Sequence, residues 1–436
     1  MTGLTQQPLR GELSLGVDLG SSGLRLAVVD ALGEPVCARS SPYPAPFRDP
    51  EGWRSGLISL CHQLPPAIRA GIGAVALDGT SGTLLLCRPD GSLGPGDLAQ
   101  ALAYHQGCPD QQAQAEALAG GQGPAASASG SLARALQLLE IADQLAEPGP
   151  WLLRHQADWL MGWLLGDWRW GEEGNNLRLG WDLQRQGWSG TIAQQRWSPY
   201  LPQICPSGSQ LGPLAPAAAT ALGLQETCQV VAGSTDANAC VLAAQPQASD
   251  GMTVLGTTLV LKQFSPIPIT GPGISCHRVA GRWLVGGASN AGAGILRRFF
   301  NDSQIRELSR QINPQEPTGL QLRPLPSPGE RFPIDDPLLA PVLEPRPISD
   351  ARYLQALLEG LTAIEAAGWT RLAQLGAPPI ERLITLGGGA QNPHWRALRQ
   401  QLLGIPVLNR PRLSAALGMA RLAAGQTGEV VAPHLP

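Results

Sequence analysis

Residues 13–33 read Leu13-Ser-Leu-Gly-Val-Asp-Leu-Gly-Ser-Ser-Gly-Leu-Arg-Leu-Ala-Val-Val-Asp-Ala-Leu-Gly33. Two apolar runs flank the small residues of Gly20–Gly23, and a second turn follows at Asp30–Gly33. Apolar runs joined by short Gly/Ser-rich turns are typical of antiparallel strands. Because a third such run covers Pro35–Ser41, we predict that the chain opens with a β-meander.

A second stretch of the same design lies in the second half of the chain. Residues 251–262 again read as strand, Gly-Thr-Thr turn and strand, and a hairpin over Ser275–Gly287 follows. Helical spacing comes after each block, most clearly over Asp350–Leu375. Two copies of one α/β unit explain this arrangement. We therefore expect two domains, 1–245 and 246–413, each a mixed β-sheet with flanking helices, facing across a cleft.

Strand-to-helix junctions are predicted at two further places. Val230–Asp236 is a strand that leads into a helix of small residues, and Arg382–Leu386 is a buried strand that ends in a glycine-rich turn. Asn392 and Pro393 suit the N-cap and first position of the helix after that turn. The other expected helices are Leu132–Ala146 with Ser131 as its cap, one that opens over Gly292–Phe300, and Leu413–Ala424.

The basic residues exclude several mechanisms. Lysine and arginine number 31 against 34 aspartates and glutamates, a net charge of −3, so we expect no nucleic-acid partner. Only Lys262 is a lysine, and it stands between Leu261 and Gln263. The Gly-Lys-Ser/Thr of a Walker A loop is therefore missing, as is the His-Arg-Asp loop of protein kinases. Any ATP must be held without a lysine clamp of either kind.

Cysteine spacing and hydropathy bear on the compartment. The eight cysteines form no Cys-x-x-Cys pair and no Cys/His cluster with zinc spacing. The stretch Met1–Glu12 has no apolar core, and no run of about 18 apolar residues occurs. We therefore expect a cytoplasmic protein with free thiols and no membrane partner.

The turns Gly20–Gly23 and Gly256–Thr258 have the composition of phosphate sites. Glycine, serine and threonine between two strands expose successive backbone N–H groups, which with the hydroxyls make an anion nest. Either turn alone is more simply an ordinary hairpin turn. As a pair they would hold the phosphates of one nucleotide from both sides.

Two aspartates stand where predicted strands end. Asp18 lies two residues before Gly20, where a carboxylate could hold a phosphate-bound Mg²⁺. Asp236 follows Gly233-Ser-Thr and could accept the proton of a sugar hydroxyl during phosphoryl transfer. The structural alternatives are a turn-capping aspartate and a helix N-cap.

Two more segments offer ligand groups. Asp78-Gly-Thr-Ser-Gly-Thr83 ends a strand and carries hydroxyls and a backbone turn, the donors and acceptors that polyol recognition needs. Gly387-Gly-Gly-Ala-Gln-Asn-Pro-His-Trp395 offers close backbone approach, an amide and a flat ring, which suit a purine and its ribose. The alternatives are a loop of turn-forming residues and a glycine-rich turn beside a core tryptophan.

The motifs occur in one order: 18–25, 78–83, 233–236, 256–258 and 387–395. Each is weak alone, but the ordered set resembles the FGGY carbohydrate kinases over residues 13–425. The resemblance implies the actin-like ATPase fold, with two ribonuclease H-like domains. Residues 1–245 would be the sugar-binding domain and 246–413 the nucleotide-binding domain, with a helix at 414–431 packing back on the first.

The middle of the chain is similar to one branch of that family. Gln156-Ala-Asp-Trp159 and Asn175-Asn-Leu-Arg-Leu-Gly-Trp-Asp182 resemble the D-ribulose kinases of cyanobacteria and plant chloroplasts. Residues 78–83 depart from the Gly-Gln or Gln-His pattern of most members, which argues against transferring a xylulose or glycerol specificity.

The resemblance also implies roles for single residues. Asp18 would hold the metal and touch the sugar, Asp236 would be the catalytic base, and Ser81 would bind the ketose. Around the phosphate path it places Ser21, Ser22 and Arg25, with Ser22 also near the substrate. The residues that would hold the nucleotide are Gly256, Thr257, Gly294, Gly388, Gly389, Asn392 and Trp395.

We therefore predict an ATP- and Mg²⁺-dependent kinase that converts D-ribulose to D-ribulose 5-phosphate, as a monomer or homodimer. Two alternatives stay open: a kinase for another ketose or polyol such as D-xylulose, and a non-catalytic sensor of nucleotide and sugar. The presence of both Asp18 and Asp236 favours the catalyst, because a sensor has no need of a base.

Overall fold

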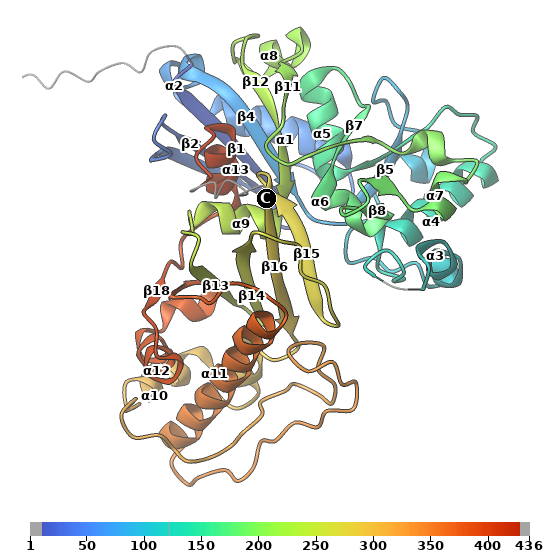
Figure 1. The fold of residues 1–436 in the computed structure, drawn as a ribbon. Helices are drawn as coiled ribbons and strands as arrows, with labels where there is room; N and C mark the ends of the chain where they lie inside the picture. The colour runs from blue at the N-terminus through green and yellow to red at the C-terminus, as the bar shows by residue number, and fades with distance from the viewer. Residues whose placement is uncertain (1–10, 122, 428–436) are drawn as a thin grey trace, which may run out of the picture. The chain divides into compact units, whose positions relative to one another are not determined.

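The computed structural model describes residues 11–121 and 123–427, which divide into two units (Figure 1). Within these ranges, unit 1 comprises the chain up to Gln245, the short segment 278–281 and residues 414–427. Unit 2 comprises residues 246–277 and 282–413. Residues 1–10 of the N-terminal stretch, and residues 428–431 of the helix expected at 414–431, lie outside the described residues.

Unit 1 is built on a six-stranded sheet with the order β11-β12-β4-β1-β2-β3. Strands β1 (Leu13–Gly20), β2 (Gly23–Val29) and β3 (Pro35–Ser41) form the antiparallel meander expected from the opening stretch. Strand β4 (Ile72–Gly79) runs parallel to β1, and β12 (Gln229–Thr235) runs parallel to β4. The edge strand β11 (Gln210–Pro213) pairs antiparallel with β12.

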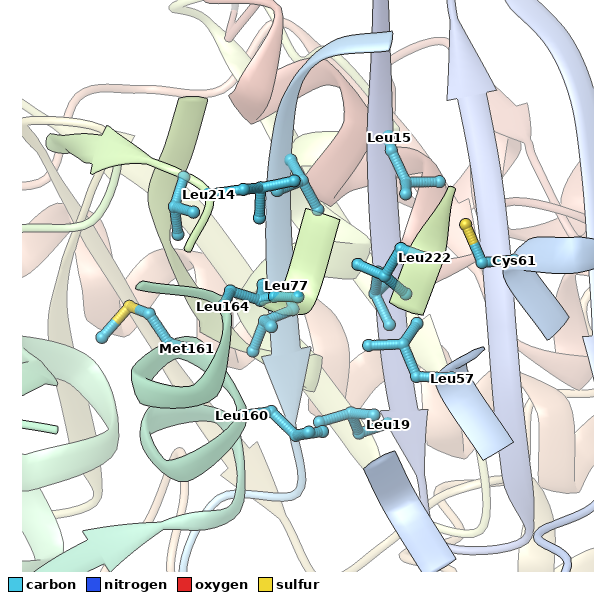
Figure 2. Packing of buried hydrophobic residues seen from close by; sticks show 14 of the residues in the cluster. Leu15, Leu19, Leu57, Cys61, Leu77, Leu160, Met161, Leu164, Leu214 and Leu222 are labelled. Carbon is cyan, nitrogen blue, oxygen red and sulfur yellow. The ribbon is translucent and has the colours of Figure 1, made fainter. Parts of the chain in front are cut away.

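Helices cover both faces of this sheet. On one face α1 (Pro50–His62), α5 (Gln156–Leu165) and α8 (Pro216–Leu222) bring apolar side chains against Leu15, Leu19 and Leu77 of β1 and β4 (Figure 2). On the other face α13 (Ala415–Ala423) lies against β1, β4 and α9 (Asp236–Ala243). This approach depends on glycines, because a Cβ on Gly16 would collide with the backbone of α13, and one on Gly418 with that of α9.

A further group of elements in unit 1 has an apolar core of its own. It contains β5 (Leu84–Cys87), β6 (Leu152–His155), α3 (Gln112–Ala119), α4 (Ser131–Gln144) and α7 (Gly190–Ala193). The predicted cap of α4 is wrong: Gly130 occupies the N-cap position, and the Ser131 hydroxyl lies 2.9 Å from Nε2 of His155. A tertiary hydrogen bond has replaced the local one.

The remaining elements of unit 1 are short. The strands are β7 (Trp170–Glu172), β8 (Trp181–Asp182), β9 (Gly187–Trp188) and β10 (Gln203–Cys205). The α-helices are α2 (Pro66–Gly71) and α6 (Glu173–Asn176), and 3₁₀ turns cover Gly96–Ala99, Pro109–Gln111, Leu177–Leu179 and Ser198–Tyr200.

Unit 2 repeats the topology of unit 1 in the sheet β15-β16-β14-β13-β17-β18. Its antiparallel part is β13 (Asp250–Leu255), β14 (Leu259–Ser265), β16 (Arg282–Ser289) and the edge strand β15 (Ile274–Val279). Strands β17 (Arg382–Leu386) and β18 (Val407–Asn409) are parallel to β13. In both units a meander is therefore followed by two parallel strands on its other side, which confirms the predicted α/β class with two mixed sheets.

The helices of unit 2 are joined by a buried ion pair. Helix α11 (Asp350–Gln374) contacts α10 (Asp302–Ser309) and α12 (Pro393–Leu403). Arg399 of α12 donates from Nε to Glu365 of α11 at 2.7 Å, and both side chains are buried. The helix expected to open over Gly292–Phe300 is a 3₁₀ helix over Ala293–Arg298. Another 3₁₀ turn covers Gly388–Gln391.

Two general expectations concern the whole chain. All eight cysteines, each within the described ranges, are free thiols, as the spacing predicted. Residues 11–121 and 123–427 contain no helix that combines the length and the apolarity of a transmembrane span.

Gly16→Ala is expected to lower the free energy of unfolding by about 3 kcal/mol or more, because the new Cβ meets backbone atoms that no rotamer change can move. Denaturant unfolding measures this. The matched control is Gly190→Ala in α7, where a Cβ meets no atom within 4 Å and helix propensity favours alanine. Equal stability of Gly16→Ala and the unsubstituted protein would contradict the described packing of α13.

Candidate active site

Three neighbouring strands of unit 1 end in a row of polar side chains. Asp18 on β1 is the register partner of Asp78 on β4, and Asp78 is the register partner of Ser234 on β12. Partners on adjacent parallel strands point to the same face, so these side chains form one row at the carboxyl ends of the strands. Asp236, the first residue of α9, follows β12 directly.

Asp18 is held by an ion pair across the meander. Arg25 is its register partner on β2 and donates from Nη1 to Oδ2 at 2.8 Å. Asp18 is only 4% exposed, whereas the Arg25 side chain is 44% exposed. The two residues that were expected at the metal and the phosphate path are thus in direct contact.

Asp236 is not the N-cap of α9, so the structural alternative considered for it is wrong. The cap is Thr235, whose hydroxyl accepts from the Asn238 N–H at 3.4 Å. Oδ1 of Asp236 accepts from the Ala237 N–H at 2.8 Å. Burial is the main cause that raises the pKa of Asp236 to about 6; the charge of Asp18 adds to it, and Ala237 and Arg178 oppose it.

Asp78 is a site residue for which sequence reasoning predicted no separate role. Its side chain is 0% exposed, and neither carboxyl oxygen has a hydrogen-bond partner among the described residues. Burial, followed by the charges of Asp18 and Asp236, holds the pKa of Asp78 well above its usual range. A signal for it exists in the sequence, because Val17-Asp18 and Leu77-Asp78 end two apolar runs in the same way.

The loop after β4 uses most of its hydroxyls internally. Thr80 donates from Oγ1 to Gln156 at 2.9 Å and lies 2.6 Å from the hydroxyl of Thr83, and both threonines are buried. Ser81 is half-buried, and Ser22 in the β1–β2 turn is exposed, as is Ser21 beside it. The predicted sugar contacts therefore differ from the threonines in being solvent-accessible.

The segment between β7 and β8 contributes residues that sequence reasoning missed. Arg178, in a 3₁₀ turn, lies close enough to Asp236 to lower the pKa of that carboxyl group. Glu172 caps α6 through the N–H groups of Gly174 and Asn175, and burial raises the pKa of Glu172 to about 8. Asn175 also donates to the Ser234 carbonyl at 3.4 Å, so this segment lies directly beside β12.

In unit 2 a cavity of about 530 Å³ opens beside the β13–β14 turn. Every unit 2 residue expected at the nucleotide lines it: Gly256, Thr257, Gly294, Gly388, Gly389, Asn392 and Trp395. Arg297, Arg306 and Arg310 supply positive charge to the same wall, whereas Lys262 is not part of it. The lysine instead donates to Ser275 at 3.0 Å, and burial lowers its pKa to about 8.

Backbone contacts fix the shape of this cavity. The N–H groups of Ala293 and Gly294 donate to the carbonyls of Gly256 and Thr257 at 2.9 and 3.2 Å. These two hydrogen bonds hold the β13–β14 turn against the 3₁₀ helix of residues 293–298. A Cβ on Gly294 would press into Thr257, whereas one on Gly388 would meet no atom within 4 Å. Gly388 therefore borders open space.

Two side chains of the cavity wall already have structural partners. Asn392 caps α12 through the N–H groups of His394 and Trp395, both at 3.0 Å, and donates to Ser309 at 2.8 Å. The Trp395 ring is 2% exposed and donates from Nε1 to Thr362 at 3.3 Å. These contacts agree with the alternative that Trp395 is a core residue. Because the ring is buried, little of its area is left for stacking on a purine.

Residues 251–426 match the C-terminal domain of the FGGY family of carbohydrate kinases. Three similar solved structures are a xylulose kinase from Rhodospirillum rubrum, a xyloylose kinase from Brucella ovis and the glycerol kinase from Plasmodium falciparum with ADP. The first is 19% identical over 96% of this chain and 91% of the other, with a TM-score of 0.78. The second is 21% identical over 95% of this chain and 90% of the other, with a TM-score of 0.77. The third is 14% identical over 95% of this chain and 89% of the other, with a TM-score of 0.76.

The similar structures show the fold of this chain, which is that of sugar kinases with two actin-like ATPase domains. Residues 251–426 are similar to the C-terminal domain of the FGGY family of carbohydrate kinases, the family that the ordered motifs resemble.

Gly388→Val is expected to weaken ADP and ATP binding by about tenfold or more, because the new side chain projects from the cavity wall without touching the protein. Isothermal titration measures the affinity, and the melting temperature should stay within a few degrees of the unsubstituted protein. Gly190→Val, outside the cavity, controls for the substitution itself. Unchanged nucleotide affinity in Gly388→Val would remove this cavity from the nucleotide site.

Proposed function

We propose that this protein phosphorylates D-ribulose with ATP, and that Asp236 is the general base. The observation that carries the proposal is the position of Asp236, at the start of α9 beside Asp18 and Asp78, where its pKa is raised to about 6. A base with that pKa is mostly ionised at neutral pH and still able to take a proton.

The reaction follows from this position. A hydroxyl oxygen of the sugar bonds to the γ-phosphorus while the bond to the ADP oxygen breaks, and the hydroxyl proton passes to the Asp236 carboxylate. The Ala237 N–H holds Oδ1 at 2.8 Å and so orients the carboxylate. Ser22 and Ser81, which are accessible, would bind further sugar hydroxyls.

Mg²⁺ and ATP complete the proposal. No cluster of three or more acidic, histidine or cysteine side chains within residues 11–121 and 123–427 is placed to hold a metal. A single carboxylate suits Mg²⁺ on ATP, because that ion keeps several waters and takes phosphate oxygens as ligands. Asp18 would supply it, and the bound ion would neutralise phosphate charge. Gly256 and Thr257 would hold the phosphates through backbone N–H groups, with Ser21 and Arg25 along the phosphate path.

A neutral sugar is favoured over a sugar acid. Asp18, Asp78 and Asp236 gather three carboxyl groups, and the positively charged residues that act on Asp78 and Asp236 are Arg25 and Arg178. A substrate carboxylate would be repelled by such a site.

The choice of D-ribulose as the substrate rests on the resemblance of residues 156–159 and 175–182 to the D-ribulose kinases. D-Xylulose is the second candidate, because similar solved structures are xylulose kinases. A cytoplasmic monomer or homodimer without nucleic-acid or membrane partners belongs to the same proposal.

The decisive experiment measures ADP release from Mg²⁺-ATP with D-ribulose, L-ribulose, D-xylulose, glycerol, a sugar acid or no sugar. Strong stimulation by D-ribulose alone is expected. Stimulation by another compound would keep the kinase and replace the substrate. ADP release that none of them changes, together with tight nucleotide binding, would favour the sensor.

Asp236→Asn is expected to lower kcat by about 10³-fold, because the amide cannot accept the proton, with ATP affinity retained. The substitution Asp335→Asn, at an exposed position, is the matched control. Full activity in Asp236→Asn would exclude Asp236 as the base.

The pH dependence of the unsubstituted enzyme gives a second prediction. Its kcat/KM should fall about tenfold per pH unit below the Asp236 pKa of about 6, since protonation removes the base.

A further inference from the structure

Unit 2 has a second cavity, of about 650 Å³, at the end of β18. Three arginines line it: Arg396, in the first turn of α12, and Arg410 and Arg412, which follow β18. No acidic residue is among the described residues of its wall. We refer to it as the arginine cavity.

The three arginine side chains have no partner in the described part of the chain. Within residues 11–121 and 123–427, none of them makes a hydrogen bond or an ion pair. By contrast, Arg399 of the same helix α12 is paired with Glu365. Arginine stays protonated at any ordinary pH, so the arginine cavity carries three charges that no described side chain neutralises. Like charges in one wall repel each other, and an anion between them would relieve that repulsion.

Hydrogen bonds hold the backbone around the arginine cavity. The Arg410 N–H donates to the Thr385 carbonyl at 2.8 Å, which continues the pairing of β18 with β17. Asn409 donates from Nδ2 to the Ala390 carbonyl at 2.6 Å and so ties the turn Gly388–Gln391 to β18. Binding of an anion therefore requires the ordering of side chains rather than of the backbone, which keeps its entropic cost low.

We propose that the arginine cavity binds a small phosphorylated anion with two or more negative charges. The planar guanidinium group offers paired N–H donors that match the oxygens of a phosphoryl group. Three such groups carry three positive charges, which matches a diphosphate-like anion better than a monoanion. The volume of about 650 Å³ lies within the range of small-molecule sites.

The arginine cavity shares part of its wall with the cavity proposed for the nucleotide, because Gln391 and Pro393 line both. The nucleotide phosphates and the bound anion are both negative, so each should lower the affinity of the protein for the other. By linkage the two effects are equal in size. The anion would thus oppose nucleotide binding, and this part of the inference rests on the proposed function.

Isothermal titration with pyrophosphate, in the absence of Mg²⁺, tests the site. In the double variant Arg410→Gln/Arg412→Gln the pyrophosphate affinity should fall about tenfold or more, because two of the three cations are lost. The matched control is Arg306→Gln/Arg310→Gln, which removes two arginines from the nucleotide cavity and should keep the pyrophosphate affinity. All four side chains are exposed, so both variants should fold, with melting temperatures close to that of the unsubstituted protein.

Three results would overturn the site. The first is that pyrophosphate does not bind to the unsubstituted protein. The second is an unchanged affinity in Arg410→Gln/Arg412→Gln. The third is a loss in the control variant as large as the loss in Arg410→Gln/Arg412→Gln, because the anion would then occupy the nucleotide cavity or respond only to the overall charge.

The coupling is tested by titrating ADP with and without pyrophosphate. Pyrophosphate should weaken ADP binding severalfold in the unsubstituted protein and leave it unchanged in Arg410→Gln/Arg412→Gln. The coupling would be disproved by an ADP affinity that pyrophosphate does not change, or by equal weakening in both proteins, which would indicate competition in the nucleotide cavity itself. If the unsubstituted protein binds no ADP, the proposed function fails, whereas the pyrophosphate titration still decides the arginine cavity.

Discussion

The register between β1 and β4 determines which side chains of unit 1 lie together at the candidate active site. Asp18 and Asp78 are paired, and side chains alternate strictly along a strand, so both carboxyl groups point away from the apolar face that α1, α5 and α8 cover. A slip of one residue in β4 would move Asp78 to that face and Leu77 to the site. The apolar contacts of Leu77 with the helices therefore hold the acid in place (Figure 2).

The two units share a topology but differ in what their strand ends offer. In unit 2 the residues paired at the ends of β13 and β17 are Val254 and Leu386, which are apolar. The cavity of that unit is instead lined by glycines and arginines among other residues. Two buried charged side chains of that unit, Glu365 and Arg399, form an ion pair that joins two helices. A repeated fold has thus been given a carboxylate row in one copy and a cavity in the other.

Local patterns predicted the strands, the glycine-rich turns and the helix capped by Asn392, because these features depend on neighbouring residues. One failure arose where a distant partner competed, because Ser131 bonds to His155, which is remote in sequence. The other was a shift of one residue, because Thr235 rather than its neighbour Asp236 caps α9. The roles of Asp18 and Asp236 were suggested by their places at strand ends. The raised pKa of Asp78 depends on strand register and burial, which no local sequence pattern contains.

Helix α13 has a consequence for how the chain is made. It covers the face of β1 opposite to α1, α5 and α8, and it is the last helix of the described chain. β1 leaves the ribosome before the other described strands, so one face of it has no final cover until α13 has also been synthesised. Unit 1 therefore cannot complete its folding early, although most of its residues precede unit 2, because the described part of unit 2 is synthesised before α13. The N-terminal unit would be the last to become native during translation.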